Sequence, residues 1–357
     1  MRDDSLCLGV PKNLGERIRQ LLKHASLLDT QREITRDKDL IQFPLLRAPS
    51  SQEWRLIRNL THKAKTISIE PKILHKVRRP HSIVEALSGC MDPSVLEHVK
   101  HSFDIIGDIA VIEVPPELAG YKRLIAEAIV KVHKGVKTVL SKSGAVDGTF
   151  RIRNYEHLLG DLKTETTHKE HGCKYMLDVT KVYFSPRLAT ERLRVASQTN
   201  SNEVVVDMFA GVGPFSILIA KKSGAKVHSI DINPDAIKYL RINCGLNKVE
   251  RLVSPILGNA REVVSEEFKG AADRVIMNLP YESLEYVDVA CLTLRSQGGK
   301  VHFYRSEVEP NPIERASVLL RSKIESSGRK LHRIVQGRLV KSIAPHQWQV
   351  ALDAIID

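Results

Sequence analysis

The residues with the clearest chemical potential lie in the run VVVDMFAGVGPF at positions 204–215. There a predicted buried strand ends at Asp207 and is followed by Phe209, Gly211 and Gly213. Glycines let the backbone approach a ligand closely, and the start of a following helix offers free N–H groups. The turn lacks the Lys-Ser/Thr of a phosphate loop, and Ser216 stands where a dinucleotide-binding turn has its third glycine. The run therefore weakens the interpretation as a pyrophosphate-binding turn.

Two later polar residues have the spacing that a nucleoside ligand requires. Asp231 ends the next predicted strand, about twenty residues past the glycines, where a carboxylate suits a ribose diol. Asn259 follows the next apolar stretch, where an adenine edge could be read, although many relatives of this kind have Asp there. The three motifs resemble those of class I S-adenosylmethionine-dependent methyltransferases. The resemblance implies S-adenosylmethionine as cofactor, and the alternative is a set of ordinary turns in an α/β protein.

A fourth motif, Asn278-Leu-Pro280-Tyr281, directly follows the predicted strand RVIM. Open α/β sheets keep their ligands at the carboxyl ends of strands, so this turn belongs with the other three. The motif is also close to the Asn-Pro-Pro-Tyr signature of methyltransferases that act on exocyclic amino groups. Leu279 breaks that pattern and weakens the rival interpretation.

A second constellation precedes the glycine turn. It comprises FRIR at 150–153 and DVTKVYFSPRLATERLR at 178–194. With these runs, the DMFAGVGPF turn and the NLP turn in the same order, the chain resembles the archaeal and eukaryotic tRNA (guanine-37-N1)-methyltransferases. The runs CLGVPKNLGERI near the start and SIAPHQWQVALD near the end extend the resemblance over nearly the whole chain.

The resemblance implies a role for each matching residue. The catalytic residues are expected to be Glu191, Arg151 and Asn278, with Pro280 in the same turn as Asn278. Residues expected to bind the target base and its surroundings are Tyr183, Arg187, Arg192 and Arg153. The resemblance also implies tRNA as partner, with the first domain at the outer corner and the remainder on the anticodon loop. We expect no membrane partner and a monomer.

The chemistry of guanine N1 agrees with these roles. N1 carries a proton and is a poor nucleophile until a base removes it, which a buried carboxylate such as Glu191 can do. A guanidinium such as that of Arg151 would then stabilise the charge on O6. The base must leave its stack to reach the pocket, which favours an anticodon loop over a duplex.

Plainer interpretations remain for several of these residues. Glu191 and Arg192 could form a surface ion pair on a helix, and Arg151 and Arg153 could simply bind phosphate. His168, His171 and Cys173 have the composition of a metal site, but HxxHxC has no second half nearby, so no metal is expected.

The elements that must position these residues change in type along the chain. Residues 204–357 alternate predicted strands and helices, which indicates a doubly wound parallel sheet, and 331–343 and 348–355 read as a terminal hairpin. We expect an α/β protein with four parts: a small N-terminal α/β tRNA-recognition domain (1–50), a basic linker (51–80), a mixed α/β substrate-binding domain (81–190) and a class I methyltransferase domain (191–357). Near the start, Asn13 is expected to cap a helix, and 175–184 to form one alternating strand.

Composition limits the setting in which this chemistry occurs. The chain has 357 residues and a formal net charge of +12, half of it in residues 51–80, where eight Lys or Arg face two acidic residues. A basic balance favours a polyanionic partner, and a basic connector favours phosphate contact. The five scattered cysteines and the polar N-terminus favour a reducing, cytoplasmic compartment.

Three alternative functions stay open. One is a wybutosine-pathway transferase that moves the aminocarboxypropyl group of the same cofactor. A second is a bifunctional enzyme that also methylates a tricyclic guanine derivative at carbon. A third is a non-catalytic RNA-binding protein, against which the intact Asp207, Gly211, Gly213 and Asp231 argue.

Overall fold

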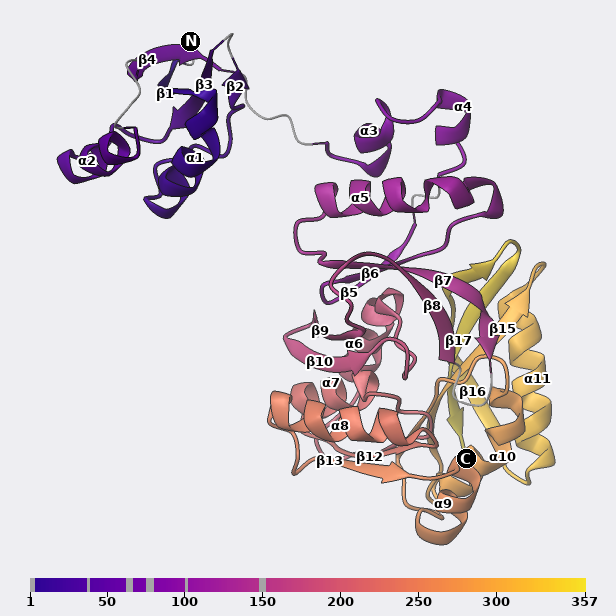
Figure 1. The fold of residues 1–357 in the computed structure, drawn as a ribbon. Coiled ribbons are helices and arrows are strands. Elements are labelled where there is room, and N and C mark those ends of the chain that lie inside the picture. The colour runs from indigo at the N-terminus through magenta and orange to yellow at the C-terminus, as the bar shows by residue number, and fades with distance from the viewer. Residues whose placement is uncertain (1–3, 37–38, 62–66, 75–79, 100–101, 148–151) are drawn as a thin grey trace. The chain divides into compact units, whose positions relative to one another are not determined.

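A computed structural model describes residues 4–36, 39–61, 67–74, 80–99, 102–147 and 152–357. The chain divides into two compact units, Met1–His81 and Ser82–Asp357 (Figure 1). No helix of the described residues is long and apolar enough to cross a membrane.

The first unit is a four-stranded sheet in the order β2-β3-β1-β4 with two helices. Its elements are β1 (Asp4–Pro11), η1 (Lys12–Leu14), α1 (Gly15–His24), β2 (Thr35–Arg36), β3 (Leu40–Leu45), α2 (Ser51–Leu60) and β4 (Ser68–Ile73). The helices bury Ile18, Leu22 and Ile57 in a core shared with Leu8 and Phe43 of the sheet. Strand β1 lies between β3 and β4 and pairs antiparallel with both.

The structure corrects two expectations for this unit. Residues 51–80 were expected to be a linker, yet α2 and β4 lie there, and β4 completes the sheet beside β1. The signal missed was a capping box: Ser50 Oγ accepts from the backbone N–H of Glu53, whose carboxylate accepts from the N–H of Ser50. Asn13 caps no helix, because a 3₁₀ turn precedes α1 and no side chain caps α1.

The second unit begins with a mixed α/β part. Its elements are α3 (Ile83–Leu87), α4 (Pro93–Leu96), β5 (Asp104–Ile106), β6 (Ile109–Ile112), η2 (Pro116–Tyr121), α5 (Lys122–Val132), β7 (Thr138–Asp147) and β8 (Ile152–Gly160). The sheet has the order β5-β6-β7-β8, and α5 buries Ile125, Ala126 and Ile129 in a core that also contains Val139. Gly107, with a φ of 58°, lies in the turn between β5 and β6.

The hairpin of β9 (Glu165–Glu170) and β10 (Cys173–Asp178) packs on the methyltransferase part. Asn243, on helix α8 (Pro234–Asn247), accepts from the N–H of Met176 at 2.6 Å and donates to its carbonyl at 3.0 Å. Asn247 makes the same pair of bonds with Lys174. Two side-chain amides one helical turn apart therefore replace a neighbouring strand at the edge of β10.

The expected single strand over 175–184 is wrong in its second half. Strand β10 ends at Asp178, whose Oδ1 accepts from both the backbone N–H and the hydroxyl of Thr180. This Asx turn diverts the chain, and the following residues lead into η3 (Pro186–Leu188) and α6 (Ala189–Ser197). The expected domain boundary at 190/191 falls inside α6 and would therefore divide a continuous helix.

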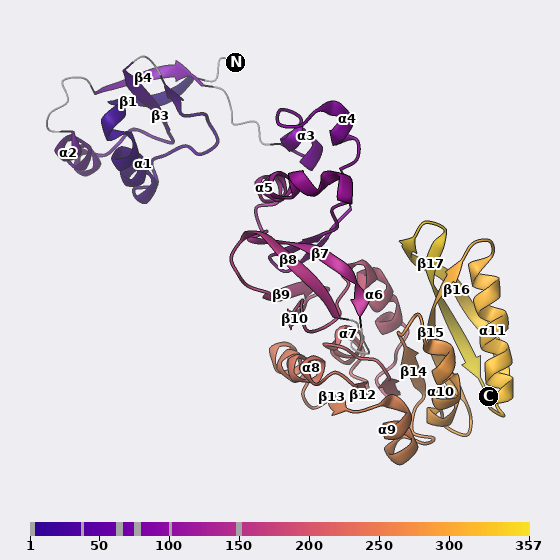
Figure 2. The ribbon, with the colours of Figure 1, turned by 45° about the vertical axis from the view of Figure 1, so that its right-hand side comes forward.

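The methyltransferase part is a seven-stranded sheet in the order β13-β12-β11-β14-β15-β17-β16. Its further elements are β11 (Val204–Asp207), α7 (Pro214–Ser223), β12 (Lys226–Asp231), β13 (Val253–Leu257), α9 (Ala260–Glu267), β14 (Arg274–Met277), η4 (Ser283–Tyr286), α10 (Val287–Thr293), β15 (Gly299–Val308), α11 (Pro312–Ser326), β16 (Leu331–Ala344) and β17 (Gln347–Ile356). Strands β11 to β15 are parallel, and β17 pairs antiparallel with β15 and β16. Figure 2 shows α11 beside the β15–β17–β16 end of the sheet. The predicted α/β class and the terminal hairpin are confirmed.

The strand order places the site. From β11 the chain passes to β12 on one side and later to β14 on the other, so the sheet reverses its direction of growth at β11. Ligands of open α/β sheets bind at such a point, outside the carboxyl ends of the strands.

Candidate active site

The turn after β11 takes the conformation that its glycines allow. Gly211 and Gly213 have φ angles of 57° and 86°, in the left-handed region. A Cβ on Gly213 would lie 2.2 Å from Leu240 Cδ1, whereas one on Gly211 would have only Tyr183 O, at 3.8 Å, within 4 Å. Gly213 is therefore required for packing, and Gly211 keeps its outer side open for a ligand.

Asp207 stabilises this turn from the protein interior. It is fully buried and its Oδ2 accepts from the hydroxyl of Ser216 at 2.7 Å. Its Oδ1 is buried and has no hydrogen-bond partner among the described residues. Burial raises the pKa of Asp207 to about 7, and the hydroxyl of Ser216 offsets only part of that rise. Asp207 does not line the adjacent cavity, so its role in the structure is to hold the turn.

Asp231 links the two turns of the predicted nucleoside site. Its carboxylate accepts from the N–H of Gly211 at 2.7 Å and from the N–H of Asn233 at 2.9 Å. Burial raises the pKa of this carboxyl, although both backbone donors favour the ionised form. Asp231 lines the cavity and retains lone pairs for a ribose diol.

The same cavity gathers the other predicted cofactor residues. Phe209, Gly211, Asp231, Asn259 and Asn278 all line it, from loops that follow four different strands. Asn259 Oδ1 also accepts from the N–H of Arg261 and caps α9, so its amide group is partly engaged. With an aromatic ring, an acid, an open glycine turn and two amides, the residues present fit an adenosine-containing cofactor. Gly213 and Pro280 do not line this cavity.

A larger cavity of about 1000 Å³ lies between the β5–β8 part and the methyltransferase sheet. Tyr183, Arg187, Pro280, Lys341 and Gln349 are among the residues that line it. Residues 183–185 and Glu282 line both cavities, so the two cavities adjoin at these residues. A base in the larger cavity would therefore lie next to a cofactor in the smaller one.

Two of the predicted substrate residues have contacts in the larger cavity. The hydroxyl of Tyr183 accepts from Lys341 Nζ at 3.0 Å. Arg187 Nε donates to Asp104 at 2.7 Å and so joins η3 to β5. Asn278 Oδ1 accepts from Gln349 at 3.1 Å, which ties the Asn-x-Pro turn to β17.

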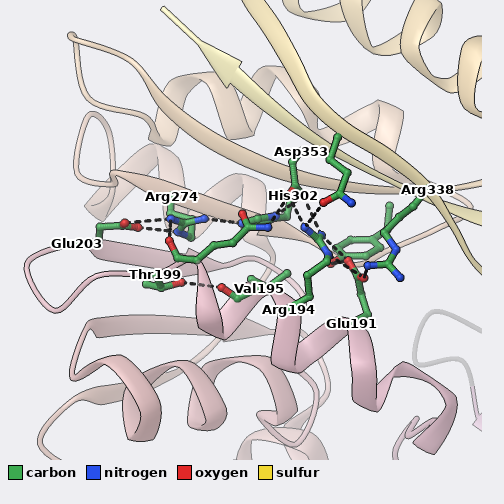
Figure 3. A network of polar contacts seen from close by, with 12 residues as sticks. Glu191, Arg194, Val195, Thr199, Glu203, Arg274, His302, Arg338 and Asp353 are labelled. Atoms are coloured by element: carbon green, nitrogen blue, oxygen red, sulfur yellow. Dashed lines mark hydrogen bonds and ion pairs between the residues drawn. The ribbon is translucent and has the colours of Figure 1, made fainter.

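Glu191, the predicted base, lies next to these cavities without lining either. It is 2 % exposed, which excludes the plainer interpretation as a surface residue. Arg194 donates to both of its oxygens, at 3.0 and 2.6 Å, and the hydroxyl of Tyr304 donates to Oε1 at 2.8 Å. Arg338 lies 3.5 Å from Oε2 and is partly exposed. The expected burial is present, and so are two guanidinium groups that the sequence analysis did not anticipate (Figure 3).

Arg192, a predicted substrate-binding residue, is bonded within the protein. It is 1 % exposed and donates to both oxygens of Glu170, at 2.8 and 3.0 Å, and to the carbonyl of Ser185 at 2.7 Å. Its guanidinium also lies 4.9 Å from the ring centre of Phe184. These contacts join α6, β9 and the loop before η3, and Arg192 also lines the smaller cavity.

The remaining predictions concern residues with little structural detail. Arg151 lies outside the described residues, and Arg153 lies on β8. His168 accepts from the N–H of Gly107, His171 contacts the carbonyl of Ala189, and Cys173 is buried. Within the described part of the chain, no group of three or more His, Cys, Asp or Glu side chains could hold a metal ion.

Several residues of the site were missed because they come from the end of the chain. Tyr304, Arg338, Lys341, Gln349 and Asp353 lie on β15, β16 and β17. One signal was available: Asp353 interrupts the apolar run VALDAII, and a carboxylate inside a buried strand requires a partner.

Comparison with known proteins identifies the family. Family models match in three stretches: the TRM5/TYW2 methyltransferase domain over residues 166–331, the TYW2 N-terminal domain over 83–164, and the tRNA methyltransferase 5 N-terminal domain over 7–53. The tRNA (guanine(37)-N(1))-methyltransferase Trm5b of Pyrococcus abyssi is 40% identical over 351 residues, 98% of each chain. Its crystal structure aligns with a TM-score of 0.71 over 99% of each chain.

Two other similar proteins are relevant to the activity of this chain. A solved complex of aTrm5 with tRNALeu is 34% identical and has a TM-score of 0.70, with 99% of this chain and 100% of that chain covered. The tRNA(Phe) (4-demethylwyosine(37)-C(7)) aminocarboxypropyltransferase of Methanocaldococcus jannaschii is 37% identical over 252 residues, 70% of this chain and 95% of that protein. The resemblance drawn from the sequence motifs is confirmed: the chain belongs to the TRM5/TYW2 methyltransferase family.

Proposed function

We propose that the chain transfers a methyl group from S-adenosylmethionine to N1 of guanosine 37 in tRNA. The observation that carries this proposal is the extent of the similarity. The Trm5b relative matches over 98% of both lengths, including the first unit, whereas the aminocarboxypropyltransferase matches 70% of this chain at 95% of its own length. The first unit, matched over 7–53 by the tRNA methyltransferase 5 N-terminal model, therefore favours N1 methylation over aminocarboxypropyl transfer.

The geometry supports a division of labour between the two cavities. Asp231, Phe209, Gly211 and Asn259 would hold the adenosine end of the cofactor, and the Asn278 turn would face the cavity shared with the substrate. S-adenosylmethionine supplies a sulfonium methyl group, and the electrons of the broken carbon–sulfur bond stay on sulfur. Because the two cavities adjoin at residues 183–185, a base in one and the methyl group in the other would be close enough for in-line transfer.

Glu191 would accept the proton of guanine N1 as the new N1–methyl bond forms. Arg194 and Tyr304 fix the orientation of its carboxylate, and Arg338 makes the longest of its contacts, at 3.5 Å. The guanine edge would displace Arg338, because this side chain is partly exposed and held by one contact to Glu191. Arg151 would stabilise the charge on O6, as the family resemblance implies.

The first unit would grip the outer corner of the tRNA, and the basic residues of 51–80 would contact its phosphates. Of the eight basic residues in this stretch, Arg55 and Arg58 lie on α2 and Lys72 lies on β4, and the other five lie outside the described residues. One chain carries both cavities and the proposed base, which supports action as a monomer.

The test is nucleoside mass spectrometry on an unmodified tRNA transcript incubated with protein and cofactor, with a transcript lacking guanine 37 as control. We expect 1-methylguanosine in the first transcript and none in the second. Gain of an aminocarboxypropyl group in place of the methyl group would refute the proposal, and a transcript carrying a tricyclic guanine derivative would reveal a second activity.

The role of Glu191 is tested separately. Glu191→Ala should lower the methylation rate by about 10²–10⁴-fold, the usual contribution of a general base, with tRNA affinity nearly unchanged. An equal loss of rate and affinity would show that Glu191 is structural.

A further inference from the structure

Glu191 ends a chain of buried charged groups that runs from α6 across the sheet (Figure 3). In order, the chain consists of Glu203, Arg274, His302, Asp353, Arg194 and Glu191. The groups come from α6, the turn before β11, and strands β14, β15 and β17. Such a chain of paired charges is costly to bury unless each group has its partners.

Arg194 connects the proposed base to the last strand. Its Nη2 donates to Glu191 Oε1 at 2.6 Å and to Asp353 Oδ1 at 2.9 Å, and its Nη1 donates to Asp353 Oδ2. Its Nε donates to Glu191 Oε2 at 3.0 Å. One planar guanidinium therefore fixes both carboxylates at once, and neither can rotate without breaking two bonds.

Asp353 is itself anchored on its other side. His302 Nδ1 lies 2.6 Å from Asp353 Oδ1, and His302 Nε2 lies 2.7 Å from Arg274 Nη1. Because a guanidinium can only donate, Nε2 must accept, so Nδ1 carries the hydrogen and donates to Asp353. This tautomer is neutral, in keeping with complete burial, which lowers the pKa of His302. Gln198 adds a third bond to Asp353, at 3.0 Å.

The polar and charged groups that face Glu191 come from four elements. They are Arg194 on α6, Tyr304 on β15, Arg338 on β16 and, through Arg194, Asp353 on β17. Burial raises the pKa of the Tyr304 phenol well above its ordinary value, so it stays protonated and donates to the carboxylate. The basicity and orientation of Glu191 thus depend on two bonds from Arg194 and one from Tyr304.

We infer that Asp353 is a positioning residue for the methyl transfer, which sets the orientation and basicity of Glu191 through Arg194. The inference rests on the proposed function, because it concerns the base of that reaction. Asp353 shares the positive charge of Arg194 with Glu191. Without this second carboxylate, all of that charge falls on Glu191, which favours its ionised form and makes it a weaker base.

Two substitutions shift this balance in opposite directions. Asp353→Asn removes a negative charge, so the acidic limb of the rate profile should move to lower pH by about one unit, with a plateau at least about tenfold lower. Tyr304→Phe removes a donor to the ionised carboxylate while Arg194 keeps its orientation, so the acidic limb should move to higher pH. General damage to the fold cannot shift the same limb in both directions.

The experiment measures single-turnover methylation of the tRNA transcript from pH 5 to 9 for the wild-type chain, Asp353→Asn, Tyr304→Phe and Glu203→Gln. The last variant is the matched control, since it also breaks a buried ion pair, with Arg274 at 2.6 Å, but neutral His302 separates it from Asp353. We expect it to lower the melting temperature and leave the acidic limb in place. KM for tRNA should stay within about twofold in all four proteins, because none of these groups lines the larger cavity.

The outcomes separate this inference from the function on which it depends. If the wild-type chain produces no 1-methylguanosine, or Glu191→Ala methylates normally, the proposed function or its base is wrong and the inference falls with it. If Glu191→Ala is inactive but Asp353→Asn and Tyr304→Phe both keep the wild-type limb, only the inference is overturned. Should Asp353→Asn fail to fold, Arg194→Lys replaces it, because it keeps the positive charge but cannot bind both carboxylates with two bonds each: a lowered plateau with unchanged KM for tRNA supports the inference, and wild-type kinetics refute it.

Discussion

Replacement of Arg192 by methionine tests whether this residue holds the fold or the RNA. Arg192→Met would remove two hydrogen bonds to Glu170 and one to the carbonyl of Ser185, and would leave the buried Glu170 carboxylate with only His168, 3.7 Å away, of its two charged partners. Breaking a buried ion pair from one side costs about 3–5 kcal/mol, because the remaining charge has lost its partner. The methionine keeps the apolar packing of the side chain and limits the loss to the polar contacts.

The expected effect is measurable by thermal unfolding. At about 2 °C per kcal/mol for a unit of this size, the melting midpoint should fall by about 6–10 °C. Glu170→Gln in the same chain should recover at least half of the loss, because neither charge is then buried alone. Affinity for the tRNA transcript, measured by filter binding at a temperature where both proteins are folded, should change less than about twofold.

The pH dependence gives an independent check. Burial alone would raise the pKa of Glu170, but bonds and charges from His168 and Arg192 outweigh it and lower the pKa below the ordinary value of 4.5. A lowered folded-state pKa contributes stability above the ordinary value, which is lost as the pH falls through the folded-state value. The stability gap between Arg192→Met and the wild-type chain should therefore shrink below pH 4.5. An unchanged melting midpoint together with a tenfold loss of tRNA affinity would refute the structural role and restore Arg192 as an RNA contact.

Three further predictions concern the turn and the first unit. Gly213→Ala should lower stability by about 1–2 kcal/mol and weaken S-adenosylmethionine binding in calorimetry, since a Cβ there would lie 2.2 Å from Leu240 Cδ1. Gly224→Ala is the control: its φ of 79° brings the same backbone strain, but no atom lies closer than 3.8 Å, so cofactor binding should stay intact. Burial raises the pKa of Asp207 to about 7, so this group stabilises the fold at acidic pH, and that contribution is lost as the pH rises from 3.8 through 7. In urea unfolding without cofactor, Asp207→Asn should therefore reduce the decrease of unfolding free energy over this pH range, by at most about 4 kcal/mol. An unchanged pH dependence of the unfolding free energy would contradict the burial argument. A chain beginning at Ser82 should bind cofactor normally and tRNA more weakly, whereas equal tRNA affinity would remove the role of the first unit.

Local sequence was sufficient for the elements that carry the cofactor. Asp207, the glycine turn and Asp231 are consecutive features of strand–turn–helix units, and β11, which leads into the turn, reads as a largely buried apolar run. Local interactions determine these features, because the φ of Gly213 and the start of α7 depend on a few neighbouring residues. The same reasoning failed where a side chain competes with the backbone for hydrogen bonds. The alternating pattern predicted a strand over 175–184, but the Asx turn at Asp178 ends that strand.

The partners of the buried charges depended on the tertiary structure. Glu191 and Arg192 are adjacent in the sequence, yet one pairs with Arg194 beneath β17 and the other with Glu170 on β9. Neighbouring positions on a helix point in directions about 100° apart, so adjacent charges enter different surroundings. No periodicity in α6 indicates which of those surroundings holds a carboxylate.

The sequence by itself determined the fold class, the cofactor turn and the family, because these rest on short contiguous motifs and on the order of those motifs along the chain. Only the tertiary structure decided what surrounds the proposed base. Tyr304 and Asp353 reach it from strands far along the chain, after the sheet has crossed over and returned antiparallel. Burial of a charge demands a partner, but the register of β15 and β17 chooses which residue provides it.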